Sequence, residues 1–252
     1  MIYLTNELGA SLTLPLTMAW TKVPLGINVP VTKLSRGGGV VSGNQALQPR
    51  AFTIEGSLFY GSVDLNHAAY DEIKQFLQHT PIEVSRYDDR EIVAYPTKFD
   101  MNGMDMDIEL QVKIDFIAPD PLFYGTAVFH EEDSLSGSTT FTASNDGTYN
   151  AKPLIHLIVT SGSFTGLTIS ANGFIIEIDG VFEADDEILI DCSKFSIEAK
   201  ELYGSYVSII TLAGDDFLVY GFELIPEENS VTINATGTYT LDMTMDYRNT
   251  WL

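Results

Sequence analysis

The segment Asp107–Tyr124 constrains the fold of this chain most, because an amphipathic strand ends there abruptly. Across Ile108–Phe116, apolar residues occupy every second position and polar residues stand between them. A period of two predicts a half-buried antiparallel strand. Two prolines then remove backbone donors and force extended geometry on the residues before them, so the sheet must end. We interpret Pro119, Asp120 and Pro121 as a hinge that separates two folding units.

The first folding unit carries further strand patterns. Alternation of apolar and polar residues, together with β-branched and aromatic side chains, predicts these strands. The pair Asn102-Gly103 predicts a turn before the Asp107–Tyr124 segment. The strands are expected at residues 12–20, 52–58, 82–84 and 91–99.

One helix is predicted in this unit, between Asp64 and His79. Ser62 or Asp64 can cap its first turn, and Thr80-Pro81 is expected to end it. Apolar residues recur there at helical spacing and should face the core. They are Leu65, Ala69, Ile73, Phe76 and Leu77.

A long stretch between Pro24 and Pro49 is punctuated by glycine and proline and shows no regular pattern. Connections of this length without regular structure are uncommon in compact domains and tend to be functional. We therefore single out this stretch as a candidate contact segment.

The second half of the chain predicts strands at short, regular intervals. They are expected at residues 154–160, 167–171, 174–178, 187–192, 206–212, 217–224, 230–235 and 239–246, with turn residues between them. Many short strands separated by turns are typical of a β-sandwich. We expect residues 134–140 to be a linker and the rest of this half to contain no helix of substance. The whole chain is thus predicted to be mainly β.

Charge is distributed unevenly along the chain. The 252 residues carry a formal net charge of -22, from 13 Lys+Arg and 35 Asp+Glu. Residues 1–120 hold 9 basic and 15 acidic side chains, whereas residues 121–252 hold 4 and 20. Such a chain repels nucleic acid and anionic membranes at long range, and solubility is the ordinary reason for its acidity.

No catalytic or metal-binding motif is evident, and we expect no enzymatic activity and no cofactor. None of the four histidines (His67, His79, His130 and His156) pairs at a metal-ligand spacing, and no Gly-x-Ser-x-Gly elbow occurs. Cys192 stands in an apolar run, which favours a buried, inert thiol over a nucleophile.

Acidic clusters leave one alternative open. Residues 131–133, 183–187 and 215–216 could in principle help to bind calcium, although solvated hairpin turns are favoured.

No stretch is long enough to predict a membrane-spanning helix. The N-terminus lacks the basic region of a secretory signal, so we expect synthesis in a cytosol.

Several segments, taken in order, resemble phage distal tail proteins. Residues 112–124, with an Asp-Pro-aromatic segment, resemble the end of that family's N-terminal domain, and Arg50–Gly56 resembles its Arg-x-φ-x-φ-x-Gly strand before a helix. Asn145–Ile155 resembles the start of its second domain. Ile188–Asp191 is similar to an Ile-x-Ile-Asp strand, and Glu223–Val231 to a Pro-Gly-x-Asn turn in which Glu replaces the usual Gly at 227 or 228. Tyr247-Arg248 with Trp251 resembles the closing strand.

The resemblance implies two domains and a structural function. Residues 1–126 would form a split β-barrel-like, ring-forming domain with one α-helix, and residues 127–252 a galectin-like β-sandwich. A homohexameric ring at the virion tail tip would join the tail-tube protein to tail-fibre or receptor-binding proteins. DNA would pass through the lumen without being bound, no membrane insertion is expected, and synthesis would occur in the host bacterial cytoplasm.

Within this scheme, the long glycine-rich stretch is the candidate for contacts between subunits or with the tube. An ordinary surface loop is the alternative. The residues singled out are Arg36, Gly37, Gly38, Gly39 and Asn44.

Two other functions are weighed against the tail protein. A lectin-like sandwich would bind glycans on exposed aromatic side chains, for which Tyr203, Tyr206 and Tyr220 are candidates, although core or turn packing is their commoner role. A glycoside hydrolase would need two carboxylates whose separation only the folded structure can set. Both are expected less than the structural role.

Overall fold

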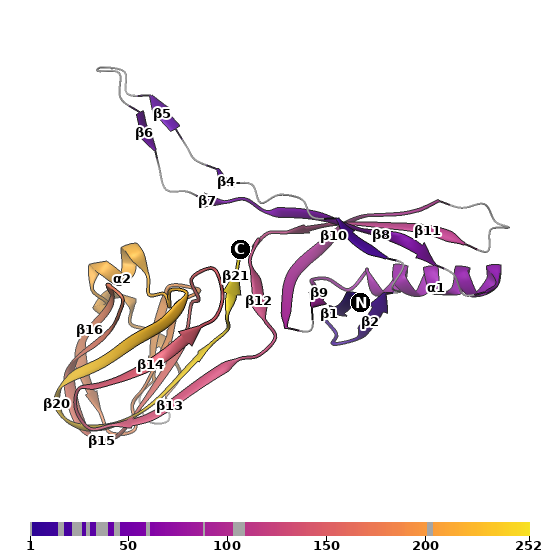
Figure 1. The fold of residues 1–252 in the computed structure, drawn as a ribbon. Coiled ribbons are helices and arrows are strands. Elements are labelled where there is room, and N and C mark those ends of the chain that lie inside the picture. The colour runs from indigo at the N-terminus through magenta and orange to yellow at the C-terminus, as the bar shows by residue number, and fades with distance from the viewer. Residues whose placement is uncertain are drawn as a thin grey trace. The chain divides into compact units, whose positions relative to one another are not determined.

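The structure is a computed structural model of the chain, and it divides into two compact units. One unit comprises Met1–Tyr124 and Leu252, and the other comprises Gly125–Trp251. The residues described are 2–14, 18–21, 27–28, 31–33, 40–42, 46–58, 61–87, 89–102, 109–200 and 204–252. The prediction of a mainly β chain is confirmed (Figure 1).

The first unit is built on one antiparallel sheet with the strand order β2-β1-β9-β10-β11-β8-β3. Its strands are β1 (Ile2–Asn6), β2 (Ser11–Leu14), β3 (Ala19–Thr21), β8 (Arg50–Leu58), β9 (Ile82–Tyr87), β10 (Arg90–Asn102) and β11 (Leu110–Ala118). A short strand, β12 (Phe123–Gly125), also pairs with β10. The described strands run from β2 at one edge to β3 at the other, so this sheet is open and not a closed barrel.

Alternation along β11 places one face of the strand in the core, as the period of two predicts. Leu110, Val112, Ile114 and Phe116 are buried, whereas the residues between them are exposed or half-buried. Phe52 of β8 stacks on Phe116 with ring centroids 5.2 Å apart. The strand ends at Ala118, directly before Pro119, because proline cannot donate to the next rung of the ladder.

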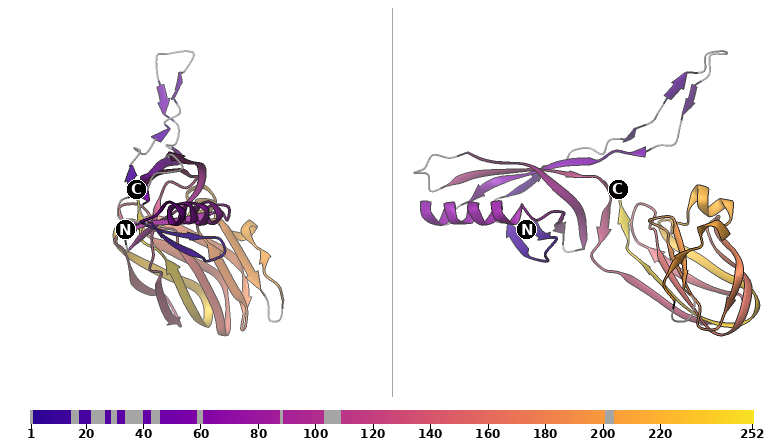
Figure 2. Two further views of the ribbon diagram at one scale, coloured as in Figure 1. Left: turned by 90° about the vertical axis from the view of Figure 1, so that its right-hand side faces the viewer. Right: turned by 180° about the vertical axis from the view of Figure 1, so that it is seen from behind.

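The helix α1 (Val63–Phe76) lies along this sheet (Figures 1 and 2). Ser62 caps it, since the Ser62 hydroxyl accepts a hydrogen bond from the Leu65 amide. Regular helix ends at Phe76 rather than at His79, because the next residues tighten into bonds from residue i to i−3. Ile73 and Phe76 pack in the core, but Leu65 is 56% exposed, so its predicted place in the core stripe is wrong.

Two other strand predictions in this unit need correction. The segment 12–20 is not one strand but contains β2 and β3, which lie at opposite edges of the sheet. Strand β1 was not predicted, because its apolar alternation is short. It nevertheless sits inside the sheet, where Leu4 pairs with Leu12 on one side and Val84 on the other. The turn expected at Asn102-Gly103 lies outside the fully described residues.

The second unit is a β-sandwich in which two long strands belong to both layers. These strands are β15 (Leu154–Ala171) and β20 (Glu227–Tyr247), which pair along most of their length. The first half of β15 continues to β17 (Glu187–Asp191), β18 (Ser196–Lys200) and β19 (Val207–Ser208), and its second half pairs with β16 (Phe174–Glu183). Likewise β20 pairs with β14 (Thr139–Asn145) in its first half and with β13 (Phe129–Leu135) in its second. The prediction of a sandwich is confirmed.

Both long strands change layer at a glycine. Gly162 has a φ of +75° and Gly237 a φ of +152°, backbone angles that residues other than glycine rarely adopt. A Cβ at Gly162 would lie 2.0 Å from the Thr238 carbonyl oxygen, and one at Gly237 would lie 2.3 Å from that of Ser163. The register of the β15–β20 ladder also shifts on both sides of Gly162. These irregularities bend the sheet so that its apolar faces enclose one core.

Several expectations for this half were wrong. Residues 134–140 form the end of β13, a turn and the start of β14 rather than a linker. Residues 206–212 contain only the two-residue β19 and a 3₁₀ turn, η1 (Ile210–Leu212), and residues 217–224 include the end of a helix, α2 (Asp215–Tyr220). Hydrophobic side chains in these segments cover the sandwich from outside the sheet, which a short apolar run cannot distinguish from a strand. The short strand β21 (Thr250–Trp251) ends the fold.

Candidate functional site

The glycine-rich stretch carries regular pairing that the sequence did not predict. Ile27–Asn28 (β4) pairs with Ala46–Leu47 (β7), and Val31–Lys33 (β5) pairs with Val40–Ser42 (β6). The described residues of the stretch thus form two strand pairs with nested registers, and we call these four strands the β4–β7 ribbon (Figure 1). The five predicted contact residues (Arg36, Gly37, Gly38, Gly39 and Asn44) lie outside the described residues, so their role stays a prediction.

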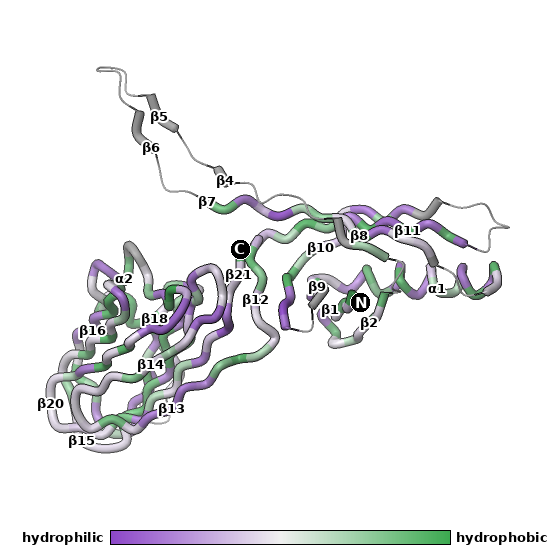
Figure 3. The backbone as a smooth tube through the Cα atoms, viewed as in Figure 1, coloured by the Kyte–Doolittle hydropathy of each residue, from purple (hydrophilic) through white to green (hydrophobic). Residues whose placement is uncertain are grey.

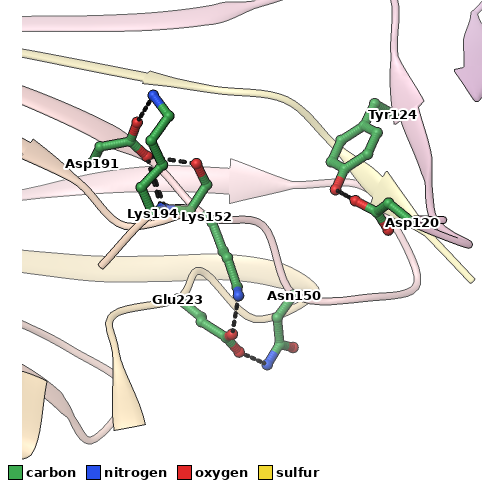
Figure 4. Close-up of polar contacts among 8 residues, drawn as sticks. Asp120, Tyr124, Asn150, Lys152, Asp191, Lys194 and Glu223 are labelled. Carbon is green, nitrogen blue, oxygen red and sulfur yellow. Dashed lines mark hydrogen bonds and ion pairs between the residues drawn. The ribbon is translucent and has the colours of Figure 1, made fainter. Parts of the chain in front are cut away.

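The predicted hinge forms a compact local turn. The Asp120 carboxylate accepts a hydrogen bond from the Leu122 amide at 3.1 Å. It accepts another from the Tyr124 hydroxyl at 2.5 Å (Figure 4). An aspartate that binds the amide two residues ahead stabilises a turn without help from the sheet. Pro121 is buried, whereas Pro119 and Asp120 are exposed. The hinge role itself remains a prediction.

A polar cluster on the second unit contains one of the three predicted aromatic residues. Glu187 of β17 accepts hydrogen bonds from Lys200 of β18 at 2.7 Å and from the Tyr206 hydroxyl at 2.5 Å. His156 of β15 lies 3.2 Å from the same carboxylate. Lys200 also lies over the Tyr206 ring, 5.6 Å from its centroid. Adjacent strands therefore bring together four groups that are distant in sequence.

The electrostatics of this cluster favour a fixed ionic arrangement. The hydrogen bond from Lys200, followed by that from Tyr206, lowers the pKa of Glu187 to about 2. Burial, followed by the hydrogen bond to Glu187, raises the pKa of Tyr206 to about 12. Glu187 is therefore ionised and Tyr206 neutral across the physiological range.

The other aromatic candidates contribute less. Tyr203 lies outside the described residues, and Tyr220 ends α2, where only its backbone is described. Tyr206 is 37% exposed, but its hydroxyl and ring face are occupied by Glu187 and Lys200. Of the three predicted tyrosines, the one whose side chain is described therefore has no free aromatic face for a glycan.

Two further side chains with catalytic potential, His130 and Cys192, have different surroundings. His130 lies 2.5 Å from Asp246 and 3.2 Å from Glu132, and the hydrogen bond to Asp246 is the main reason its pKa is raised. Cys192 is buried, and burial raises the pKa of its thiol, which keeps it protonated. Within the described part of the chain, no three His, Cys, Asp or Glu side chains gather as metal ligands. No helix there is long and apolar enough to span a membrane.

Two buried asparagines close the end of the sandwich. Asn145 donates to the Tyr149 and Leu224 carbonyls, and its own oxygen accepts from the Gly147 and Thr250 amides. A Cβ at Gly147 would lie 2.0 Å from the Thr250 carbonyl oxygen. The sequence motif Asn145–Ile155 therefore joins the start of the sandwich to its last strand.

The second asparagine, Asn229, organises the turn before β20. It donates to the Ala143, Ile225 and Glu227 carbonyls and accepts from the Ile225 amide. Glu227 has a φ of +83°, the conformation that glycine would adopt without strain. Its position in the resembling turn, where glycine is usual, explains this strained backbone.

The second unit is similar in sequence to a known protein family. Residues 146–251 match the family model SPP1_Dit, described as the C-terminal domain of a siphovirus-type tail component. Because the second unit contains this match, we refer to it below as the tail component domain. That tail component domain includes the asparagine-closed end of the sandwich, the Glu187 cluster and the turn at Glu227.

The complete chain also shares its fold with a solved structure. The Dit protein of phage SPP1, described as a paradigm of the hub adsorption apparatus in phages that infect Gram-positive bacteria, matches with a TM-score of 0.66 and 18% identity. The match covers 100% of both chains. The predicted resemblance to phage distal tail proteins is confirmed by the family match over residues 146–251 and by this shared fold, and both support a structural component of a phage tail.

Other comparisons are weaker. A chain of the phage P2 baseplate in its activated conformation with Ca matches with a TM-score of 0.44 and 10% identity, over 97% of this chain and 98% of that one. The same baseplate with Sr gives a TM-score of 0.44 and 9% identity, over 96% and 97%. No curated protein matches the chain.

Proposed function

We propose that the chain is one subunit of a homohexameric ring at the tail tip of a phage. The ring would join the tail tube to the baseplate, tail fibres or receptor-binding proteins, and DNA would pass through its lumen. The observation that carries the proposal is the full-length likeness to the SPP1 hub protein, together with the family match at residues 146–251.

The division of labour follows the two units. The first unit, with the single open sheet and α1, would form the ring, and the β4–β7 ribbon would contact a neighbouring subunit or the tube. The tail component domain, as a galectin-like sandwich, would form a peripheral platform. Both units have separate cores, which suits a scaffold whose parts contact different neighbours.

The acidic charge is compatible with DNA passage but does not require it. The unit Gly125–Trp251 holds most of the excess acid, whereas the unit proposed to surround the lumen is only moderately acidic. Long-range repulsion of phosphate would still disfavour DNA binding. Solubility therefore remains the ordinary reason for the charge.

Negative-stain electron microscopy of the purified protein tests the proposal. Six-fold rings with a central opening are the expected result. Clean monomers at high protein concentration, both alone and with tail tips that lack this subunit, would contradict a ring-forming hub.

A further inference from the structure

A pocket lies in the tail component domain where β15 ends and β16 begins, whereas the Glu187 cluster lies at the start of β15. It has a volume of about 340 Å³. Its walls are the turn between β15 and β16 and parts of the α2 segment. The lining residues are Asn172, Gly173, Phe174, Ile175, Asp216 and Gly221.

The pocket combines an apolar wall with one carboxylate. Phe174 and Ile175 are half-buried, and Phe174 packs against the core of the sandwich, so this wall is fixed. Asp216 is exposed and lies in the first turn of α2. Asn172 is held in place because its amide donates to Asn229 at 2.5 Å. A ligand that fits must therefore be partly apolar and positively charged at one end.

The domain supplies no cation of its own to this carboxylate. It contains four Lys and Arg residues, and each is engaged elsewhere. Lys152 pairs with Glu223, Lys194 with Asp191, and Lys200 with Glu187 (Figure 4 shows the first two). Arg248 donates to the Gly125 carbonyl at 2.5 Å. Among the described residues, no ion pair to Asp216 is found, so its charge is available to a partner.

Near the pocket, a lysine of the domain itself already lies between an aromatic ring and a carboxylate. The Lys152 ammonium lies 5.1 Å from the centroid of the Phe195 ring and 3.7 Å from the Glu223 carboxylate. Gly221 separates this site from the pocket, since a Cβ there would lie 2.7 Å from the Phe195 ring. An aromatic ring and a carboxylate thus hold a cation at Phe195 and Glu223, and the pocket that Gly221 lines also contains an aromatic residue, Phe174, and a carboxylate residue, Asp216.

We propose that this pocket binds an arginine side chain presented by a partner polypeptide. The guanidinium would pair with Asp216, and its plane and methylene stem would lie against Phe174 and Ile175. Arginine suits the pocket better than lysine because its planar, weakly hydrated head stacks on aromatic faces. The net negative charge of the domain would steer such a basic segment toward it.

The test uses the full-length chain and a capped Ser-Arg-Ser peptide that carries a neutral dye and a photo-crosslinking group. The same peptide with citrulline is the neutral, isosteric control. We expect saturable binding by fluorescence anisotropy and crosslinks that map to residues 172–175. The citrulline peptide should bind at least about fivefold more weakly, since it cannot form the ion pair.

Two neighbouring substitutions separate the pocket from general electrostatics. Asp216→Asn and Asp215→Asn remove the same charge from the same helical turn, but only Asp216 lines the pocket. We expect Asp216→Asn to weaken arginine-peptide binding by about threefold to fivefold and Asp215→Asn by less than about twofold. Phe174→Leu should also weaken binding, because it keeps an apolar wall and removes the ring.

Three outcomes would overturn the proposal. They are equal losses in the two Asn variants, crosslinks spread over the acidic surface, and equal binding of the citrulline peptide. Equal binding of a lysine peptide would overturn the assignment to arginine. The test needs no phage particle, so its failure would leave the proposed hub function standing, and a failure to form rings would not affect this result.

Discussion

At the scale of single residues, the tail component domain is shaped by positions whose backbone or charge is unusual. Glu227 adopts a left-handed conformation because Asn229 binds three carbonyls around the turn and holds it there. Glu187 is held ionised by donors from two other strands and from Tyr206. The state of Glu187 depends on neighbours that are distant in the sequence, whereas Glu227 is held mainly by a residue two positions away.

Replacing Glu227 with Gly is expected to stabilise the protein. A left-handed conformation costs a non-glycine residue roughly 1 kcal/mol, and glycine removes most of that strain. We expect the free energy of unfolding to rise by about 0.5 to 1 kcal/mol, measured by urea denaturation. Glu228→Gly is the matched control, with the same charge change at the next residue, which has no positive φ. It should lower stability, and a rise in both variants would point to charge relief instead.

The pH dependence of stability should reflect Glu187. Its pKa is lowered from 4.5 to about 2 in the folded state, so this site binds fewer protons in the folded protein than in the unfolded chain. This contribution is complete above pH 4.5 and is lost as the pH falls toward 2. We expect wild type to lose stability between these values more steeply than Glu187→Gln does, measured by thermal unfolding. Parallel curves would show that the Lys200 and Tyr206 bonds do not stabilise the fold.

At the scale of elements, the corners of β15 and β20 decide the architecture. Both strands are longer than one layer requires, and each is bent where a glycine brings the two backbones close together. Without these bends the two halves of each strand would continue as one flat sheet with an exposed apolar face. The sandwich is thus a single sheet folded over its own core.

Gly162→Ala is expected to destabilise the domain by about 3 kcal/mol or more, because strain at positive φ adds to a clash with the Thr238 carbonyl. Gly173→Ala provides the control. Gly173 has a φ of +90°, but nothing lies within 4 Å of its added Cβ. This variant should lose only about 1 kcal/mol. Equal losses in thermal unfolding would show that the close approach at the corner carries no weight.

At the scale of the whole molecule, the proposed function depends on assembly. A ring-forming hub would act through the surfaces that it offers to neighbouring subunits and tail proteins. The described strands of the β4–β7 ribbon pair among themselves, in sheets separate from the main sheet. We propose that ring formation depends on this ribbon.

Deleting residues 37–43 should therefore abolish the ring. We expect the particle mass from light scattering to fall from that of a hexamer toward 27.8 kDa, the mass of one chain. Circular dichroism should retain the β signal, since both cores lie outside the deleted residues. An intact ring in the deletion variant would show that the ribbon is a surface feature without a role in assembly.

The sequence by itself determined the mainly β class, the stop after Ala118, a helix cap at Ser62 or Asp64, and the sandwich in the second half. These are local properties, since alternation, proline and capping residues act within a few positions of the chain. Only the tertiary structure decided where β1, β2 and β3 lie in the sheet, and that residues 134–140 belong to paired strands. It alone placed His156, Glu187, Lys200 and Tyr206 together, and Phe174 beside Asp216. Pairing register and chain reversal set those distances, and neither is encoded in a short stretch of sequence.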